Sequence, residues 1–164
     1  MQKEMSFKPN KPKPSRLNVR AKPASGILEI VGKPTIVLVT VCTKNRKRVL
    51  HHDGVHGTLV SIWRQCNSWR VGRYVIMPDH IHLFVAPTEQ SVPFENWVRY
   101  WKSRFTKTYR STWRWQSGHW DTRIRSREHY IDRCDYVFLN PVRHELVRKA
   151  EEWEFRGEVY PIDW

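Results

Sequence analysis

Two strand-like runs separated by a proline turn constrain the fold of this chain most strongly. Residues 69–77 and 80–86 both have the β-branched and aromatic composition of strands, and Met77-Pro78-Asp79 stands at their junction. Proline cannot donate to a sheet ladder, so a smooth central strand through Pro78 is excluded. The two runs are therefore expected to form a hairpin or a bulged continuation within an antiparallel sheet.

The other segments divide by hydrophobic period. A composition rich in β-branched residues predicts a strand at 35–42, and a short further strand is expected at 120–125. Apolar residues at helical spacing predict helices, at 55–67, 94–112, 127–139 and 143–152. Asp53 and Ser126 are expected to cap the first and third helices, and Pro141 to stop or bend the third. The order β-α-β-β-α-β-α predicts an α+β fold, a ferredoxin-like (RRM-like) antiparallel sheet with helices packed on it.

The charge balance points to a polyanionic partner. The 164 residues include 29 Lys+Arg against 16 Asp+Glu, a formal net charge of +13, which favours nucleic acid. Residues 1–26 hold seven Lys or Arg, one Glu and four Pro, with little apolar surface. They are predicted to form a disordered basic Lys/Pro-rich tail, and residues 27–164 a single domain.

Several other classes of protein are excluded by composition. No run of apolar residues has the length that spans a membrane, and no apolar core follows the basic start as a secretory signal requires. Cys42, Cys66 and Cys134 lie far apart and form no CxxC pair, which argues against a disulfide scaffold or a cysteine zinc site. A reducing cytoplasmic compartment is the simplest interpretation.

A basic stretch lies between Trp97 and Arg127, with nine basic residues, one acidic residue and interleaved aromatic residues. A charge run is ordinarily a solvated helix face, but aromatic residues among cations suit phosphate contact combined with base stacking. The predicted DNA-binding cations are Arg99, Lys102, Arg104, Lys107, Arg110, Arg114, Arg123 and Arg125. The predicted stacking residues are Trp113, Trp115 and Trp120.

Two histidines form a candidate metal site. His80 and His82 are two residues apart on a predicted strand, so their side chains point to the same face. Two imidazoles side by side can supply two ligands to one divalent ion. The alternative is a pair of solvent-facing histidines on an amphipathic strand.

A tyrosine and an asparagine share one face of a predicted helix. Tyr136 and Asn140 are four residues apart, and Asp132 lies four before Tyr136. Taken alone, this pattern also suits an ordinary packing helix in which Tyr136 is half buried and Asn140-Pro141 is the stop.

The two strings together resemble a known family. MPDHIHLFV (77–85) and DYVFLNPVRHELV (135–147) resemble signatures of the one-tyrosine HUH transposases of the IS200 kind, and more closely those of REP-associated tyrosine transposases. The resemblance covers residues 34–155, with Glu145 standing where the family usually has Gly. It implies that Tyr136 is the nucleophile and that His80, His82 and Asn140 hold Mg²⁺ or Mn²⁺.

The implied activity is that of a metal-dependent single-stranded DNA endonuclease and strand transferase. It would form a 5′-phosphotyrosine intermediate on hairpin DNA, as a monomer or homodimer in the bacterial cytoplasm, associated with the nucleoid when bound. A non-catalytic RRM-like nucleic-acid-binding module is the alternative, although the aromatic RRM signature is absent. A hydrolytic nuclease using the same metal would leave Tyr136 dispensable.

Overall fold

The proline turn joins two neighbouring antiparallel strands of one sheet. In the computed structural model, which describes residues 35–90, 92–162 and 164, β2 (Trp69–Ile76) pairs with β3 (His80–Pro87). The backbone N–H of Met77 donates to the carbonyl of His80 at 2.8 Å, so Pro78 lies in the turn, where its missing N–H removes no ladder bond. The predicted hairpin is confirmed.

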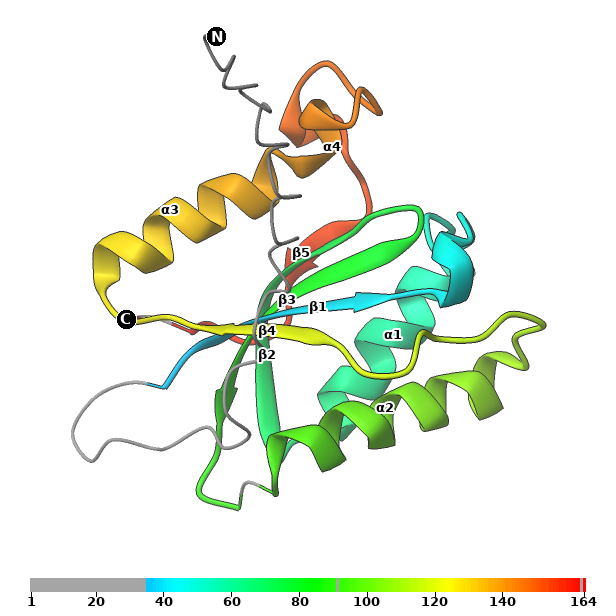
Figure 1. The fold of residues 1–164 in the computed structure, drawn as a ribbon, viewed down its shortest axis with the longest axis horizontal. Coiled ribbons are helices and arrows are strands. Elements are labelled where there is room, and N and C mark those ends of the chain that lie inside the picture. Colours follow the sequence, from blue (N-terminus) through cyan, green and yellow to red (C-terminus); the bar gives the residue numbers. More distant parts are fainter. Residues whose placement is uncertain (1–34, 91, 163) are drawn as a thin grey trace, which may run out of the picture.

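The sheet has five strands in the order β4-β1-β3-β2-β5, and every neighbouring pair is antiparallel (Figure 1). Its other strands are β1 (Val37–Cys42), β4 (Trp120–Arg123) and β5 (Arg156–Glu158). The helices are α1 (Asp53–Gln65), α2 (Phe94–Tyr109), α3 (Arg127–Phe138) and α4 (Asn140–Arg143), with 3-10 turns η1 (Lys44–Arg46) and η2 (Ala150–Glu152). The predicted α+β fold is confirmed.

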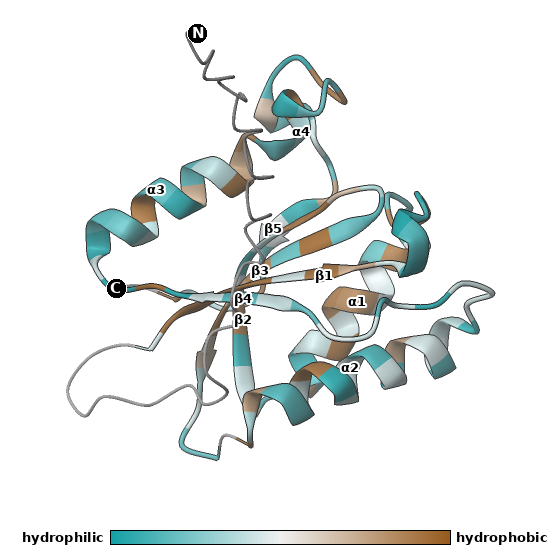
Figure 2. Cartoon of the chain, in the orientation of Figure 1, coloured by the Kyte–Doolittle hydropathy of each residue, from teal (hydrophilic) through white to brown (hydrophobic). Residues whose placement is uncertain are grey.

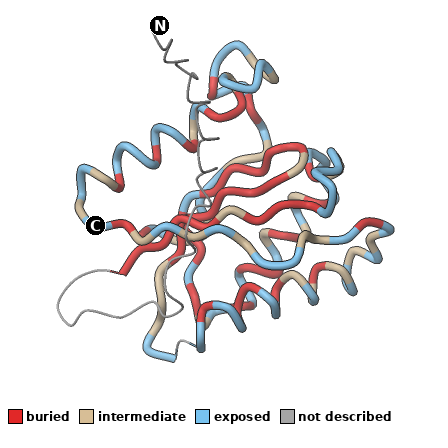
Figure 3. The backbone as a smooth tube through the Cα atoms, in the orientation of Figure 1, coloured by how far each residue is buried: buried red, intermediate tan, exposed pale blue. Residues whose placement is uncertain are grey.

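The helices lie in two layers, with α1 and α2 on one face of the sheet and α3 on the other (Figure 1). Side chains along β3 alternate between the layers. Ile81, Leu83 and Val85 belong to the core under α1 and α2, whereas Phe84 belongs to the core under α3. Figure 3 shows the central strands buried and the outer side of α3 exposed.

Some boundaries differ from the sequence-based expectations. Asp53 is the first residue of α1, and the cap is His52, whose Nδ1 accepts a hydrogen bond from Gly54 N–H at 3.1 Å. Ser126 caps α3 as expected, because its Oγ accepts from His129 N–H at 3.1 Å. Helix α2 ends before residue 112, since Arg110 adopts a left-handed conformation with φ of 51°.

The segment after Pro141 is the least regular. The expected helix over 143–152 is wrong: α4 ends at Arg143, Glu145 has a φ of 56°, and only the short turn η2 follows. Strand β5 was not predicted. The basic tail at 1–26 lies outside the described residues. Among the helices of the described ranges, none combines the length and the apolar character needed to cross a membrane.

Trp101 is the centre of the aromatic core, and replacing it with alanine should lower the free energy of unfolding by about 3–5 kcal/mol. Its ring is fully buried and contacts Trp63, Trp97 and Trp115 at centroid distances of 5.9, 6.3 and 5.6 Å. Trp120→Ala is the control, because this side chain is 51% exposed and should cost no more than about 0.5 kcal/mol. Urea unfolding measures both, and equal losses would contradict the assignment.

Candidate active site

Strand β3 places His80 and His82 on the face covered by α3, at the end next to the hairpin turn. Their Nε2 atoms lie 3.2 Å apart, and their side chains are buried, with 5% and 8% exposure. The predicted placement on a common face is confirmed. The alternative of two solvent-facing histidines is wrong, because both rings lie beneath the chain that follows α3.

The outer nitrogen of each imidazole has its own partner. His80 Nδ1 lies 2.7 Å from Asp79 Oδ1, and His82 Nδ1 lies 2.9 Å from Thr40 Oγ1. An ionised carboxylate only accepts, so His80 donates through Nδ1 and keeps a lone pair on Nε2. The same arrangement at His82 requires its Nδ1–H to donate to the Thr40 hydroxyl. Partners of this kind orient histidine ligands around a metal ion.

Arg46 holds the Asp79 carboxylate from the other side. Its Nε lies 2.7 Å from Asp79 Oδ2, and its Nη1 donates to Cys42 Sγ at 2.8 Å. Burial raises the pKa of Asp79, but the hydrogen bond with His80 and the charge of Arg46 together hold that pKa below its usual value. Asp79 therefore stays ionised at neutral pH and orients His80.

Asn140 completes a cluster of three side chains. It is the first residue of α4, is 3% exposed, and places its amide Nδ2 3.4 Å from His82 Nε2. A half-turn of the amide group would bring Oδ1 to the same position. The structure thus brings together all three ligands that the sequence predicts.

Burial also keeps both imidazoles neutral. Burial lowers the pKa of His80, and burial, with a smaller electrostatic contribution from the adjacent His80 imidazole, lowers the pKa of His82 to about 3. Neutral imidazole is the form that binds a metal ion.

The cluster fits a divalent cation in its geometry. Two nitrogens at adjacent positions of an octahedral ion with bonds of about 2.1 Å lie about 3.0 Å apart, close to the 3.2 Å between His80 and His82. Within the described ranges, no group of three or more His, Cys, Asp or Glu side chains could hold a metal. The third side chain beside the histidine pair is instead the amide of Asn140.

Tyr136 lies on α3 one helical turn before Asn140. Its side chain is 40% exposed, and the guanidinium of Arg143 lies 4.6 Å from the centre of its ring. In the described part of the chain, no hydrogen bond or ring contact joins Tyr136 to either histidine. Its side chain is thus partly exposed, and its ring forms a cation–π contact that was not expected from the sequence.

His144 was also missed by the sequence analysis. Its ring lies 6.2 Å from the ring of His80, at an angle of 62°. The sequence carried a weak signal, since His144 falls inside the same string as Asn140.

The structure places the part of the basic stretch that lies on α2 in a different layer from the histidines. Helix α2 covers the opposite face of the sheet, so its predicted DNA-binding cations, Arg99, Lys102, Arg104 and Lys107, lie in the other layer. Two of the four have internal partners: Lys102 donates to the carbonyls of Gln116 and Gly118, and Arg104 to the side chain of Gln65. A charge run in the sequence does not specify the face on which it folds.

The remaining predicted DNA contacts are dispersed. Trp113 is 8% exposed and belongs to the core, and the partly buried Trp115 packs against it and against Phe105. Arg123 pairs across the sheet with Val37, which faces α1 and α2. Among the exposed cations, Arg110 at the end of α2 lines the same hollow as Arg48, Arg114 lies beside η1, and Arg125 follows β4.

Trp120 is the predicted stacking residue that does lie on the histidine face. Thr40 pairs with His82 on one side and with Trp120 on the other, and directly opposed residues point to the same face. Trp120 is 51% exposed on the edge strand β4. It is therefore an exposed aromatic surface in the same cross-strand row as a predicted metal ligand.

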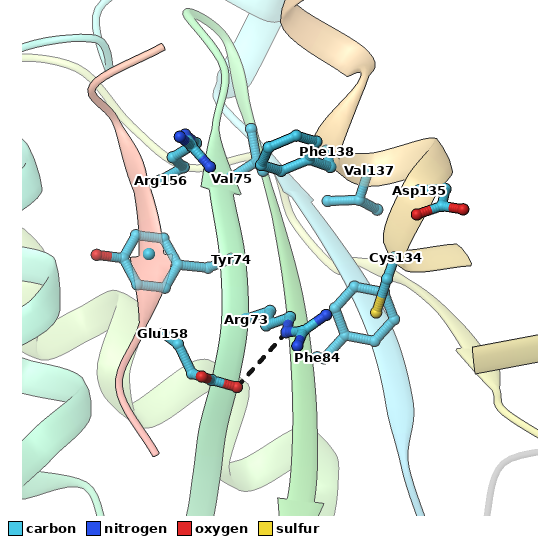
Figure 4. Close-up of a pocket in the computed structure, with 11 residues that line it drawn as sticks. Arg73, Tyr74, Val75, Phe84, Cys134, Asp135, Val137, Phe138, Arg156 and Glu158 are labelled. Carbon is cyan, nitrogen blue, oxygen red and sulfur yellow. Dashed lines mark ion pairs between the residues drawn. The ribbon is translucent and has the colours of Figure 1, made fainter. Parts of the chain in front are cut away.

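A cavity of about 480 Å³ lies between α3 and strands β2 and β5. Figure 4 shows its lining, with Arg73 paired to Glu158 at 3.6 Å and Phe138 near Arg156. The lining includes none of the three predicted ligands and not Tyr136. This cavity is thus distinct from the candidate active site.

An antiparallel sheet with paired histidines on one strand, and a tyrosine-bearing helix across that face, is the arrangement expected of a tyrosine transposase. Residues 35–144, more than half of the 164, match the family model described as Transposase IS200 like, and the chain belongs to this family.

Two relatives make the comparison more specific. A REP-associated tyrosine transposase of Escherichia coli (strain K12) is 28% identical over 136 residues, which is 76% of this chain and 81% of the relative. A solved structure of a REP-associated tyrosine transposase bound to a REP hairpin has a TM-score of 0.66 and 25% identity, and the match covers 85% of this chain and 90% of that one. The resemblance inferred from the two strings is confirmed.

Proposed function

We propose that this transposase is a metal-dependent single-stranded DNA endonuclease and strand transferase that forms a 5′-phosphotyrosine intermediate on hairpin DNA. The observation that carries the proposal is the convergence of His80 Nε2, His82 Nε2 and the Asn140 amide one helical turn from Tyr136. The solved relative bound to a REP hairpin supports a DNA hairpin as the substrate.

The chemistry follows from the residues of the site. The Tyr136 oxygen attacks the scissile phosphorus, forming a P–O(Tyr) bond and breaking the bond from phosphorus to the 3′ oxygen. The phenolic proton is lost, and a proton ends on the departing 3′ oxygen. Attack by a 3′-OH on the phosphotyrosine reverses these changes and rejoins a strand with no external energy source.

Each group of the site has a separate task. Mg²⁺ or Mn²⁺, held by His80, His82 and Asn140, would supply polarisation of the phosphate and neutralisation of its developing charge. Asp79 and Thr40 fix the two imidazoles through their Nδ1 atoms. Because Asn140 lies 3.4 Å from His82 of its own chain, we place Tyr136 in the site of its own chain, which allows a monomer to act.

A denaturing gel tests the proposal. A single-stranded hairpin labelled on the 3′ side of the cleavage point, incubated with the chain and Mn²⁺, should give a labelled band that migrates with the protein, and EDTA should abolish it. A labelled product with a free 5′ end would instead indicate a hydrolytic nuclease. Hairpin binding without cleavage, unaffected by EDTA, would indicate the RRM-like binding module.

A further inference from the structure

A second group of cations lies at the same end of the sheet as the histidines. Residues 44–48 contain four Lys or Arg in five positions and no acidic residue, and all five positions are exposed. Figure 2 shows this segment, which follows β1, as strongly hydrophilic. With the neighbouring Arg114 it forms what we call the β1 basic surface, made of Lys44, Lys47, Arg48 and Arg114.

The segment is fixed to the turn that precedes His80. Thr43 N–H donates to the carbonyl of Asp79 at 3.0 Å, and Val49 and Leu50 N–H donate to the carbonyl of Pro78 at 2.8 and 2.9 Å. On its other side, Lys44 N–H donates to the carbonyl of Arg114 at 2.8 Å. The β1 basic surface therefore has a defined position beside the candidate active site.

The backbone of the segment is strained, which is common at functional sites. Asn45 and Arg46 have φ values of 58° and 53°, which lie in the left-handed region that residues other than glycine seldom occupy. Arg46 is held there by Asp79 and Cys42, and its charge is used inside the site.

The other cations of the segment are not used in this way. In the part of the chain that the structure describes, Lys44, Lys47, Arg48 and Arg114 form no ion pair. No aromatic side chain lies among residues 44–48, so the segment offers phosphate contacts and no stacking platform.

We propose that the β1 basic surface binds the DNA phosphates adjacent to the phosphodiester that Tyr136 attacks. This inference rests on the proposed function and deepens it, because it moves the electrostatic contact from α2 to the segment that follows β1. The segment lies beside the hairpin turn where β3 begins (Figure 1), whereas Arg99, Lys102, Arg104 and Lys107 of α2 lie on the opposite face of the sheet from the histidines. DNA held here would run directly past His80.

Two double variants with the same charge change test the surface. Lys44→Ala/Arg48→Ala removes two exposed cations from it, and Arg99→Ala/Lys107→Ala removes two exposed cations from α2. Fluorescence anisotropy measures hairpin affinity between 50 and 300 mM salt. The first variant should bind about tenfold more weakly at low salt, and its plot of log K against log salt should lose a slope of about 1.4–1.8, the value for two phosphate contacts. The second should match the wild type.

An unstructured strand of equal length separates the two sources of phosphate. If the first variant loses affinity only for the hairpin, the β1 basic surface contacts phosphates of the stem. If it loses affinity equally for both oligonucleotides, the surface contacts phosphates of the unpaired strand. Both results support DNA binding by the surface. Equal effects of the two double variants would overturn it. Anisotropy measures binding and does not depend on cleavage, so this result concerns the β1 basic surface alone. The proposed function would instead be overturned if the wild type bound the hairpin but formed no adduct.

Discussion

The variant Tyr136→Phe should form no covalent adduct with hairpin DNA, and its cleavage rate should fall by about 10⁴–10⁶-fold, as expected when a catalytic nucleophile is removed. Phenylalanine keeps the ring that contacts Arg143 at 4.6 Å and removes only the hydroxyl. Binding of the hairpin should therefore stay within about twofold of the wild type. The adduct is measured on a denaturing gel, and binding by anisotropy.

Tyr100→Phe is the matched control for this prediction. Tyr100 is 54% exposed, similar to the 40% of Tyr136, but it lies on α2 in the opposite layer. Its loss should leave the adduct unchanged. An adduct that persists in Tyr136→Phe would show that another group attacks phosphorus, and the role given to Tyr136 would then be wrong.

The histidine pair could be predicted from the sequence because its placement depends on local geometry. Residues two apart on a strand share a face, and Pro78 fixes where that strand begins. Tyr136 and Asn140 are likewise one turn apart along the chain, so their proximity needs no knowledge of the fold. Asn140 contacts His82, which lies 58 residues earlier in the chain. Only the family resemblance predicted that these two residues lie together.

The supporting groups depend on register and could not be predicted. Thr40 reaches His82 because β1 and β3 pair these residues, and Arg46 reaches Asp79 because the segment after β1 folds back on the hairpin turn. The layer of the basic stretch is hidden for the same reason: its charge is visible in the sequence, but the sequence does not show which face of the sheet α2 covers. Trp113 and Trp115 pack against Phe105 through tertiary contacts. Because the sequence does not show these contacts, it predicts exposed stacking residues at both positions.

The variant His82→Ala should abolish adduct formation while the protein still binds the hairpin. His82 is the central member of the cluster, since its Nε2 lies 3.2 Å from His80 Nε2 and 3.4 Å from the Asn140 amide. Removing a residue that only supports a metal ligand typically weakens metal binding by roughly 10–100-fold. Removing His82, a ligand itself, should weaken Mn²⁺ binding by more than this. Electron paramagnetic resonance of Mn²⁺ measures this directly, and Asn140→Ala should act in the same direction.

His51→Ala is the control for Mn²⁺ binding. His51 lies exposed before α1, so its replacement should leave Mn²⁺ binding unchanged.

Mixing the His82→Ala and Tyr136→Phe variants tests which chain supplies the nucleophile. Tyr136 precedes Asn140 by four residues, about 6 Å along a helix, and Asn140 contacts His82 of the same chain. Each chain should therefore need its own tyrosine and its own histidines, and the mixture should stay inactive. Recovery of about a quarter of wild-type activity would mean instead that a dimer exchanges its tyrosine helices.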